Sequence, residues 1–463
     1  MKRLMLMLLA LPALAQAQTP TSVSLAQAQQ YAVEHSFAVR GAQLDAESAA
    51  RRVKELTAIG LPQVSGSMEY QNFIDIPVQV APADAFGLPP YLNQFLFDVS
   101  QETGVDLNAP QVDPNAVTEL QFGTPQNMSA GIQVTQLVFD GSYFVGLQAA
   151  KLSATLSQDV ITKSEKDTRD EVAEAYYTVL IAERNVEILT DSRELLAEST
   201  AETEALVEAG FAEQQDLDQL QLNVADLDTR IAYAQQQVDV AKKLLKFQMG
   251  LDLEAPLTLT DKLDNLISED MSMLSLNFKP ESTIEYQLQE TVVDLQRLNV
   301  KNERMKGYPQ IAGFYTYQQN AFRDEFSFLD FDQSWYPTQL WGLQMNVPIF
   351  GSFQGKHRIA QADVELRKAQ VDLEQVSEGA ALENATARNE YAYALSNYQN
   401  QSRSVELAQR IFNTTRIKYN EGLATSFELT QADNQLLSAQ GNYVSAMLQL
   451  LNARTRLARS FNQ

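Results

Sequence analysis

Residues 422–457 read GLATSFELTQADNQLLSAQGNYVSAMLQLLNARTRL, and from Leu429 onward their apolar residues recur at alternating steps of three and four. A strict alternation of this kind is a heptad repeat, which keeps one apolar stripe facing a partner helix. The same repeat occurs earlier in the chain, in residues 217–245. The chain therefore contains an internal duplication built on coiled-coil hairpins. The two stripes are Leu429, Ala432, Leu436, Ala439, Tyr443, Ala446, Leu450, Ala453, Leu457 and Leu217, Leu220, Val224, Leu227, Ile231, Ala234, Val238, Ala241, Leu245.

The first residues have the pattern of a secretory signal peptide. Two basic residues precede an apolar run, Leu4–Leu14, which is too short to span a bilayer and is followed by small residues. We expect residues 1–17 to be a signal peptide, cut after Ala15 or Ala17, and the mature chain to be exported. The chain has no cysteine. That excludes a disulfide framework, a lipid anchor on cysteine and a thiol nucleophile.

Charge and motifs narrow the function class further. The formal net charge is -24, which argues against nucleic-acid binding. The two histidines, His35 and His357, are far apart, and the sequence contains no HExxH, no glycine-rich phosphate loop and no GxSxG. We therefore expect a protein that is not an enzyme and that holds no cofactor and no metal.

Two long stretches without helix breakers precede the two heptad stripes. Residues 142–209 contain no proline and one glycine, and a helix of that length is on the order of 100 Å long. We expect Ser142 to cap it and Ser24 to cap a shorter helix over residues 23–60. The chain divides into a first structural repeat, residues 18–250, an inter-repeat linker, residues 251–281, and a second structural repeat, residues 282–463, with tip turns near residues 210 and 422.

Four segments alternate apolar and polar residues with a period of two, which is typical of strands between lipid and water. They are residues 63–71, 128–139, 310–318 and 339–350. No apolar stretch after the signal peptide approaches the roughly 18 to 20 residues that a membrane helix needs. We therefore expect these strands to make any membrane crossing.

The first two strands are separated by a long insert, residues 73–127. It contains several prolines and acids and no basic residue. Because so many prolines disfavour long regular elements, we expect an outward-facing, extracellular insert that folds only locally.

One chain offers too few strands for a closed barrel, which needs about eight or more. Open sheet edges are not tolerated in lipid, so several chains must share one barrel. The expected fold is mainly α, with long coiled-coil hairpins that form a tube beneath a shared membrane β-barrel. Aromatic residues at strand ends are expected in the interfacial girdles; they are Tyr70, Phe139, Tyr317, Trp335, Tyr336, Trp341 and Phe350.

At this level of detail the chain resembles the TolC-like outer-membrane efflux proteins over almost its whole mature length. The resemblance rests on a helix, Leu-Pro-Gln, strand opening at residues 61–63 and its counterpart Tyr-Pro-Gln at 308–310. It also rests on strands that end in Phe-(Asp)-Gly-Ser, at 139–142 and 350–352, and on the twofold repeat. The glycine turns resemble the periplasmic tips of the family, which meet an adaptor; their residues are Gly210, Phe211, Ala212, Gly422, Leu423 and Ala424.

This resemblance implies a homotrimer with a 12-stranded barrel in the outer membrane that extends into the periplasm. It also implies docking through a periplasmic adaptor (membrane fusion) protein onto an inner-membrane pump of RND or ABC type, with outer-membrane lipid around the barrel. The implied function is a passive exit duct in a tripartite efflux or type I secretion system. The exported substrate does not follow from the sequence.

The resemblance also predicts an acidic ring at the periplasmic entrance. Family members with a described entrance carry two aspartates three residues apart after the tip glycine. Here the matching positions hold Glu428 and Gln431 in the second repeat, and Asp216 and Gln219 in the first. One acid per repeat remains, and the alternative is that each merely stabilises the first turn of its helix.

An alternative from another class is a periplasmic coiled-coil scaffold or adaptor that does not span the membrane. A scaffold of this kind does not require four segments that alternate apolar and polar residues and have one polar face. We therefore favour the duct.

Overall fold

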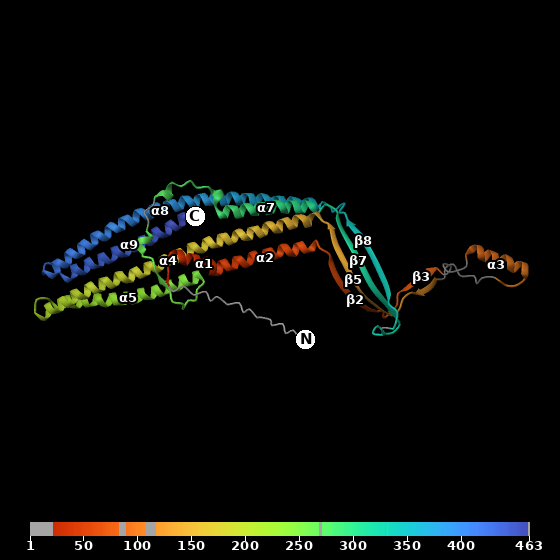
Figure 1. Cartoon of the computed structure of the whole chain (residues 1–463), viewed down its shortest axis with the longest axis horizontal. Helices are drawn as coiled ribbons and strands as arrows, with labels where there is room; N and C mark the ends of the chain where they lie inside the picture. The colour runs from red at the N-terminus through yellow and green to blue at the C-terminus, as the bar shows by residue number, and fades with distance from the viewer. Residues whose placement is uncertain (1–21, 83–88, 108–116, 268–270, 331, 462–463) are drawn as a thin grey trace, which may run out of the picture. The chain divides into compact units, whose positions relative to one another are not determined.

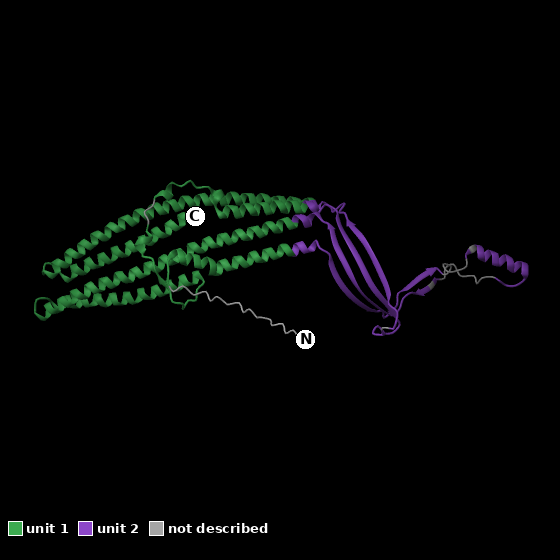
Figure 2. Cartoon of the chain, viewed as in Figure 1, with its two compact units in different colours: residues 1–54, 146–303, 356–463 green, residues 55–145, 304–355 purple. Residues whose placement is uncertain are grey.

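The computed structural model describes residues 22–82, 89–107, 117–267, 271–330 and 332–461. The predicted signal peptide, residues 1–17, lies outside the described residues. The chain forms two compact units (Figure 2): Met1–Lys54, Gly146–Glu303 and Lys356–Gln463 make up unit 1, and Glu55–Val145 and Arg304–Gly355 make up unit 2.

Unit 1 is built from long helices. The two longest, α4 (Gly141–Glu208) and α8 (Gln354–Asn420), have 68 and 67 residues, and each is about 100 Å long at 1.5 Å per residue. Each is followed by a partner helix in a hairpin, α5 (Gln214–Met249) or α9 (Ser426–Ser460) (Figure 1). The shorter helices are α1 (Leu25–His35), α2 (Phe37–Ile59) and α7 (Ile284–Met305). The long uninterrupted helices predicted from the sequence are thus present.

Both heptad stripes face the inside of unit 1. Leu220 and Leu245 of α5 and Leu429 and Leu457 of α9 are 0% exposed. The remaining stripe residues are buried or half-buried. Burying an aliphatic side chain of this size contributes about 1.5 to 3 kcal/mol, so the stripes are the main source of hairpin stability.

The segment 23–60 is two helices rather than the one that we predicted. Ser36 is extended, with φ -60° and ψ 149°, and its Oγ accepts a hydrogen bond of 3.3 Å from Val39 N. Ser36 therefore caps α2 as Ser24 caps α1, where a capping box with Gln27 confirms the expected start.

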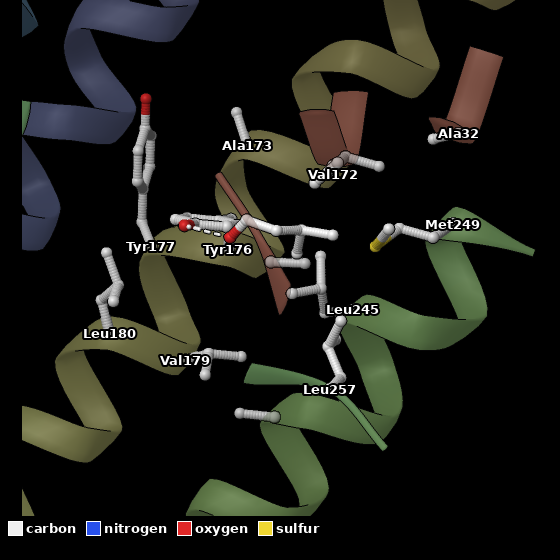
Figure 3. Close-up of a cluster of buried hydrophobic side chains, with 14 of the residues drawn as sticks. Ala32, Val172, Ala173, Tyr176, Tyr177, Val179, Leu180, Leu245, Met249 and Leu257 are labelled. Carbon is white, nitrogen blue, oxygen red and sulfur yellow. Dashed lines mark hydrogen bonds between the residues drawn. The ribbon is translucent and has the colours of Figure 1, made fainter. Parts of the chain in front are cut away.

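The largest core cluster joins α4, α5 and the inter-repeat linker. Figure 3 shows Tyr176 of α4 lying among Val179, Leu245, Met249 and Leu257. These side chains are buried. The inter-repeat linker therefore contributes to the core of unit 1, whereas the sequence predicted only a connection between the repeats.

The hydroxyl of Tyr176 also holds the N-terminal segment in place. It lies 2.9 Å from Oδ2 of Asp261 and 3.1 Å from the carbonyl oxygen of Val23. The same Oδ2 accepts a hydrogen bond of 2.7 Å from Leu25 N. Strand β1 (Ser22–Val23) pairs here in parallel with β6 (Thr258–Leu259), and a short helix, α6 (Leu263–Leu266), follows.

Unit 2 contains a four-stranded antiparallel sheet with the order β2-β5-β7-β8. Its strands are β2 (Gln63–Asn72), β5 (Gln126–Phe139), β7 (Gln310–Arg323) and β8 (Tyr336–Asn346). Strand β7 is longer than predicted, and β8 ends at Asn346 instead of residue 350. Pro348, which has no N–H to donate to a sheet, follows two residues after that end.

The cap of the first strand-to-helix turn differs from the prediction, and the second turn has another geometry. Asp140, not Ser142, caps α4, because its Oδ1 accepts hydrogen bonds from Ser142 N at 2.7 Å and from Tyr143 N at 3.3 Å. The second turn has no aspartate at this place. Its backbone passes instead through left-handed conformations at Ser352 (φ 48°) and Phe353 (φ 65°) before α8 begins.

The insert between β2 and β5 contains more regular structure than predicted. A short hairpin pairs β3 (Val78–Pro82) with β4 (Val117–Gln121), and α3 (Pro90–Thr103) is a 14-residue helix. The prolines did not prevent this helix because Pro90 occupies its first turn, where no backbone N–H donor is needed. Gly104, in a left-handed conformation, ends it.

Among the described residues, no helix is both long enough and apolar enough to cross a membrane.

Candidate functional site

The first hairpin tip is a helix end closed by glycine. Gly210 has φ 79°, and the hydrogen bonds Gly210 N to Val207 O (3.0 Å) and Phe211 N to Leu206 O (2.8 Å) form a Schellman motif. A side chain at position 210 would meet no atom within 4 Å. Glycine is therefore favoured there by its backbone conformation alone.

The second tip repeats this geometry. Gly422 has φ 74°, Gly422 N donates to Tyr419 O (2.9 Å) and Leu423 N donates to Lys418 O (2.7 Å). Both tips also expose large apolar side chains: Phe211 is 83%, Leu423 78% and Phe427 70% exposed. Exposed apolar groups at the end of a hairpin are suited to contact with another protein.

Glu428, predicted for the entrance ring, closes the first turn of α9. Its carboxylate accepts a hydrogen bond of 2.8 Å from Thr425 N, and Glu428 N donates to Thr425 Oγ1 at 3.2 Å. This is a capping box, and the backbone hydrogen bond from Thr425 lowers the pKa of the fully exposed Glu428. Glu428 is therefore ionised and free to face solvent.

Asp216, the other predicted acid, has a different partner. Its Oδ1 accepts a short hydrogen bond from Ser426 Oγ, at the start of α9 in the other hairpin. The two acids stand at equal offsets from their tip glycines, but only Asp216 joins the two tips.

Further polar contacts join the two hairpins behind the tips. Thr203 Oγ1 and Tyr419 Oη are 2.6 Å apart, and Asn223 Nδ2 donates to Thr430 Oγ1 at 3.0 Å. The sequence alone did not single out Thr203, Tyr419, Asn223 or Ser426. Their polar character, in helices that otherwise pack through apolar side chains, is the only signal that could have indicated them.

In unit 2, the register of the sheet separates an apolar face from a polar face. Val64 pairs with Val134, Val134 with Tyr315, and Tyr315 with Trp341, so one row crosses all four strands on the same face. This face is open in the single chain, with Val64 68% and Trp341 79% exposed. The next row, on the opposite face, is Ser65, Gln133, Thr316 and Leu340.

The aromatic residues predicted for the girdles do not all stand at strand ends. Tyr70 contacts Phe326 and Phe328 edge-on near the loop between β7 and β8, and Trp335 directly precedes β8. Tyr317 and Trp341 instead lie in the middle of β7 and β8. The expectation of a strand-end position is wrong for these two, because their alternation fixes the face of the sheet and not the depth.

No group of three or more potential metal-ligating side chains occurs in the part of the chain that the structure describes.

Comparisons with known proteins agree with this geometry. Residues 287–463 match the family model of outer membrane efflux proteins. A search of the curated proteins finds no match.

Solved structures with a similar fold include outer-membrane channels. CusC is 15% identical with a TM-score of 0.70, and the match covers 96% of this chain and 95% of that one. The outer membrane protein VceC of Vibrio cholerae is 13% identical (TM-score 0.66; 94% and 95% covered). The open state of the MtrE outer membrane channel of Neisseria gonorrhoeae is 14% identical (TM-score 0.68; 94% and 88% covered).

The family match and the shared fold confirm the resemblance to the TolC-like outer-membrane efflux proteins and the predicted fold class. The matched family consists of channels, not enzymes, and its location is the outer membrane, as predicted.

Proposed function

We propose that this chain forms the exit duct of a tripartite efflux or type I secretion system and passively conducts substrates from an inner-membrane pump through a periplasmic adaptor to the exterior. The observation that carries this proposal is the sheet of unit 2, which has one mainly apolar face and two unpaired edges. The outer-membrane channel fold supports it.

The unpaired edges favour assembly with other copies of the chain. Among the described strands, β2 pairs with β5 alone and β8 with β7 alone. Each edge leaves backbone N–H and C=O groups without partners, which is costly in lipid. If β8 of one copy pairs with β2 of the next, three copies form a closed barrel of twelve strands. We therefore propose a homotrimer.

The faces of the sheet suit a barrel that conducts polar substrates. The apolar face would meet outer-membrane lipid, and the polar face would line water. Rows of the polar face include Ser67, Gly131, Gln318 and Thr338, and then Glu69, Ser129, Asn320 and Tyr336.

The helices of unit 1 also expose apolar stripes that a neighbouring copy can cover. On α5, Tyr233, Val240 and Phe247 are 64%, 61% and 54% exposed. On α8, Val371 and Leu382 are 61% and 69% exposed. Stripes of this kind on opposite hairpins favour a ring of coiled coils.

The tips are the proposed contact with the periplasmic adaptor. The residues involved are Gly210, Phe211, Ala212, Gly422, Leu423 and Ala424. Asp216 and Glu428 are the proposed acidic entrance, and residues 73–127 are the proposed extracellular insert. We propose the repeat boundaries 18–250 and 282–463 as the units of duplication.

Solubilisation of the outer-membrane fraction tests the proposal against a periplasmic scaffold. We expect a detergent-dependent, heat-modifiable species with the native mass of three chains, which produces ion conductance in planar bilayers. A protein released by osmotic shock without detergent, or a stable monomer, would refute the duct and favour the scaffold.

A further inference from the structure

A carboxylate is buried at the contact between the two hairpins. Asp433 of α9 is 5% exposed, and its Oδ1 accepts a hydrogen bond of 2.9 Å from Ser192 Oγ of α4. Ser192 is itself 6% exposed. Because α4 belongs to the first hairpin and α9 to the second, this contact holds the hairpins together about two helical turns behind the start of α9.

The surroundings of Asp433 are mostly apolar. Leu429, Ala432 and Leu436 of α9 form a buried cluster with Ala408 and Phe412 of α8. A second cluster, Leu196, Leu220 and Leu227, belongs to the first hairpin. An ionised carboxylate at this place is poorly solvated.

Asp433 also lines a small polar cavity with a volume of about 20 Å³. That is room for roughly one water molecule. The cavity is further lined by Asn223, Asp226, Arg230, Thr430 and Asn434. The carboxylate thus has little water around it.

The positive charges near this contact are engaged by other acids. Arg230 of α5 pairs with Asp226 at 2.7 Å, and Arg193, next to Ser192 on α4, pairs with Asp228 at 2.9 Å. Farther along, Arg416 of α8 lies 3.8 Å from Glu198 of α4. Burial raises the pKa of Asp433 from an ordinary value of 3.8 to about 6, and the Ser192 hydroxyl opposes part of that rise.

We propose that Asp433 and Ser192 form a proton-controlled latch between the two hairpins of one chain, closed when the carboxyl group is protonated and loosened when it is ionised. An acid whose pKa is higher in the closed form stabilises that form fully below its ordinary pKa. This stabilisation is lost as the pH rises through about 6.

Opening the latch would also weaken the tips, because the other contacts between the hairpins lie close to it. The bonds Thr203–Tyr419 and Asp216–Ser426 exist only while the hairpins are together. A shift of about two pKa units changes the equilibrium between closed and separated hairpins on the order of 100-fold over the whole titration. Between pH 5 and pH 7 the expected change is about tenfold. The step from separated hairpins to an open duct entrance rests on the proposed function. The latch itself does not depend on that function.

The absence of native cysteine allows a direct test on the full-length, detergent-solubilised protein. Ser199 of α4 is 3% exposed and lies two turns from Ser192, on the same face of the helix. We therefore expect the thiol of Ser199→Cys to react when the hairpins separate. The control is the thiol of Asn420→Cys, at an exposed position. Dividing the alkylation rate of the first thiol by that of the control removes the pH dependence of thiol ionisation.

We expect this relative rate to rise about tenfold from pH 5 to pH 7. Adding Asp433→Asn should keep the rate low and independent of pH, whereas the matched control Asp218→Asn, at an exposed acid, should leave the rise intact. Adding Ser192→Ala, which keeps the carboxylate, should move the midpoint to higher pH.

A flat rate with Asp433 present, or an unchanged rise after Asp433→Asn, would overturn the latch. If Asp433→Asn does not fold, the midpoint in Ser192→Ala decides, and an unmoved midpoint rejects the proposal. None of these readouts uses conductance, so failure of the latch and failure of the duct are distinguishable.

Discussion

The two hairpin tips have the same backbone but different side-chain contacts. Gly210 and Gly422 close both long helices with the same pair of hydrogen bonds, and an acid follows six residues later in each. In the second tip that acid, Glu428, binds its own helix start; in the first, Asp216 binds the other hairpin. The two tips thus share the turn, which the backbone dictates, while their acids take different partners.

A third glycine turn gives the strongest contrast with the tips. Gly250 ends α5 with φ 72°, but a side chain there would lie 2.4 Å from the carbonyl oxygen of His35. We expect Gly250→Ala to lower stability by about 3 kcal/mol or more, from backbone strain and overlap together. Gly422→Ala has strain alone and should cost about 1 kcal/mol. Thermal unfolding followed by circular dichroism measures both, and equal losses would mean that the space around Gly250 is not limiting.

The bond from Ser426 to Asp216 should matter more than any contact within one tip. We expect Ser426→Ala to destabilise the joined tips by about 1 to 2 kcal/mol, because a hydrogen bond to a charged group is lost at a half-buried site. Limited proteolysis at the tips measures this separation. Ser460→Ala, at the far end of α9, is the control and should leave tip cleavage unchanged.

Removing the N-cap side chain should destabilise α9 but not α5. Thr425→Ala removes a side-chain cap from α9 and should cost about 1 kcal/mol. Glu213→Ala, at the equivalent position of α5, should cost almost nothing, because the side chain of Glu213 makes no capping hydrogen bond. Hydrogen exchange of the first-turn amides resolves the two sites, and similar losses at both would remove the asymmetry between the tips.

The smallest expected effect concerns the proposed acidic entrance. The double change Asp216→Asn, Glu428→Gln should lower the cation preference about two- to fivefold in planar-bilayer recordings, because clustered acids in a constriction attract cations. Trimer assembly should remain intact. An unchanged ratio of cation to anion permeability would mean that both acids serve their helix starts and the tip contact only.

The sequence was a good guide wherever periodicity sets the structure. The heptad stripes predicted a set of buried or half-buried side chains on α5 and α9, although Met447 and Leu451 are buried outside them. The twofold alternation predicted four strands, and these place Val64, Val134, Tyr315 and Trp341 on one face. These patterns work because burial repeats with the geometry of the helix and the strand.

Helix caps and hydrogen-bond partners that are distant in the sequence were harder to predict. The break at Ser36 and the cap at Asp140 depend on which polar side chain reaches a free backbone N–H. The partners of Asp216 and Asp433 lie more than 200 residues away in the chain, and one sequence carries no signal for such a pair. The middle-strand position of Trp341 escaped prediction because alternation specifies a face and not a depth.

The pairing of β1 with β6 sets an order of events in folding. Leu25 N donates to Asp261 across 236 residues. The residues of α1 to α5 must therefore be synthesised before β1 can pair with β6. Contacts between such distant residues form late, because the intervening chain loses entropy when it closes the loop. In a chain synthesised from the N-terminus, β1 therefore stays unpaired until more than half of the chain has been made.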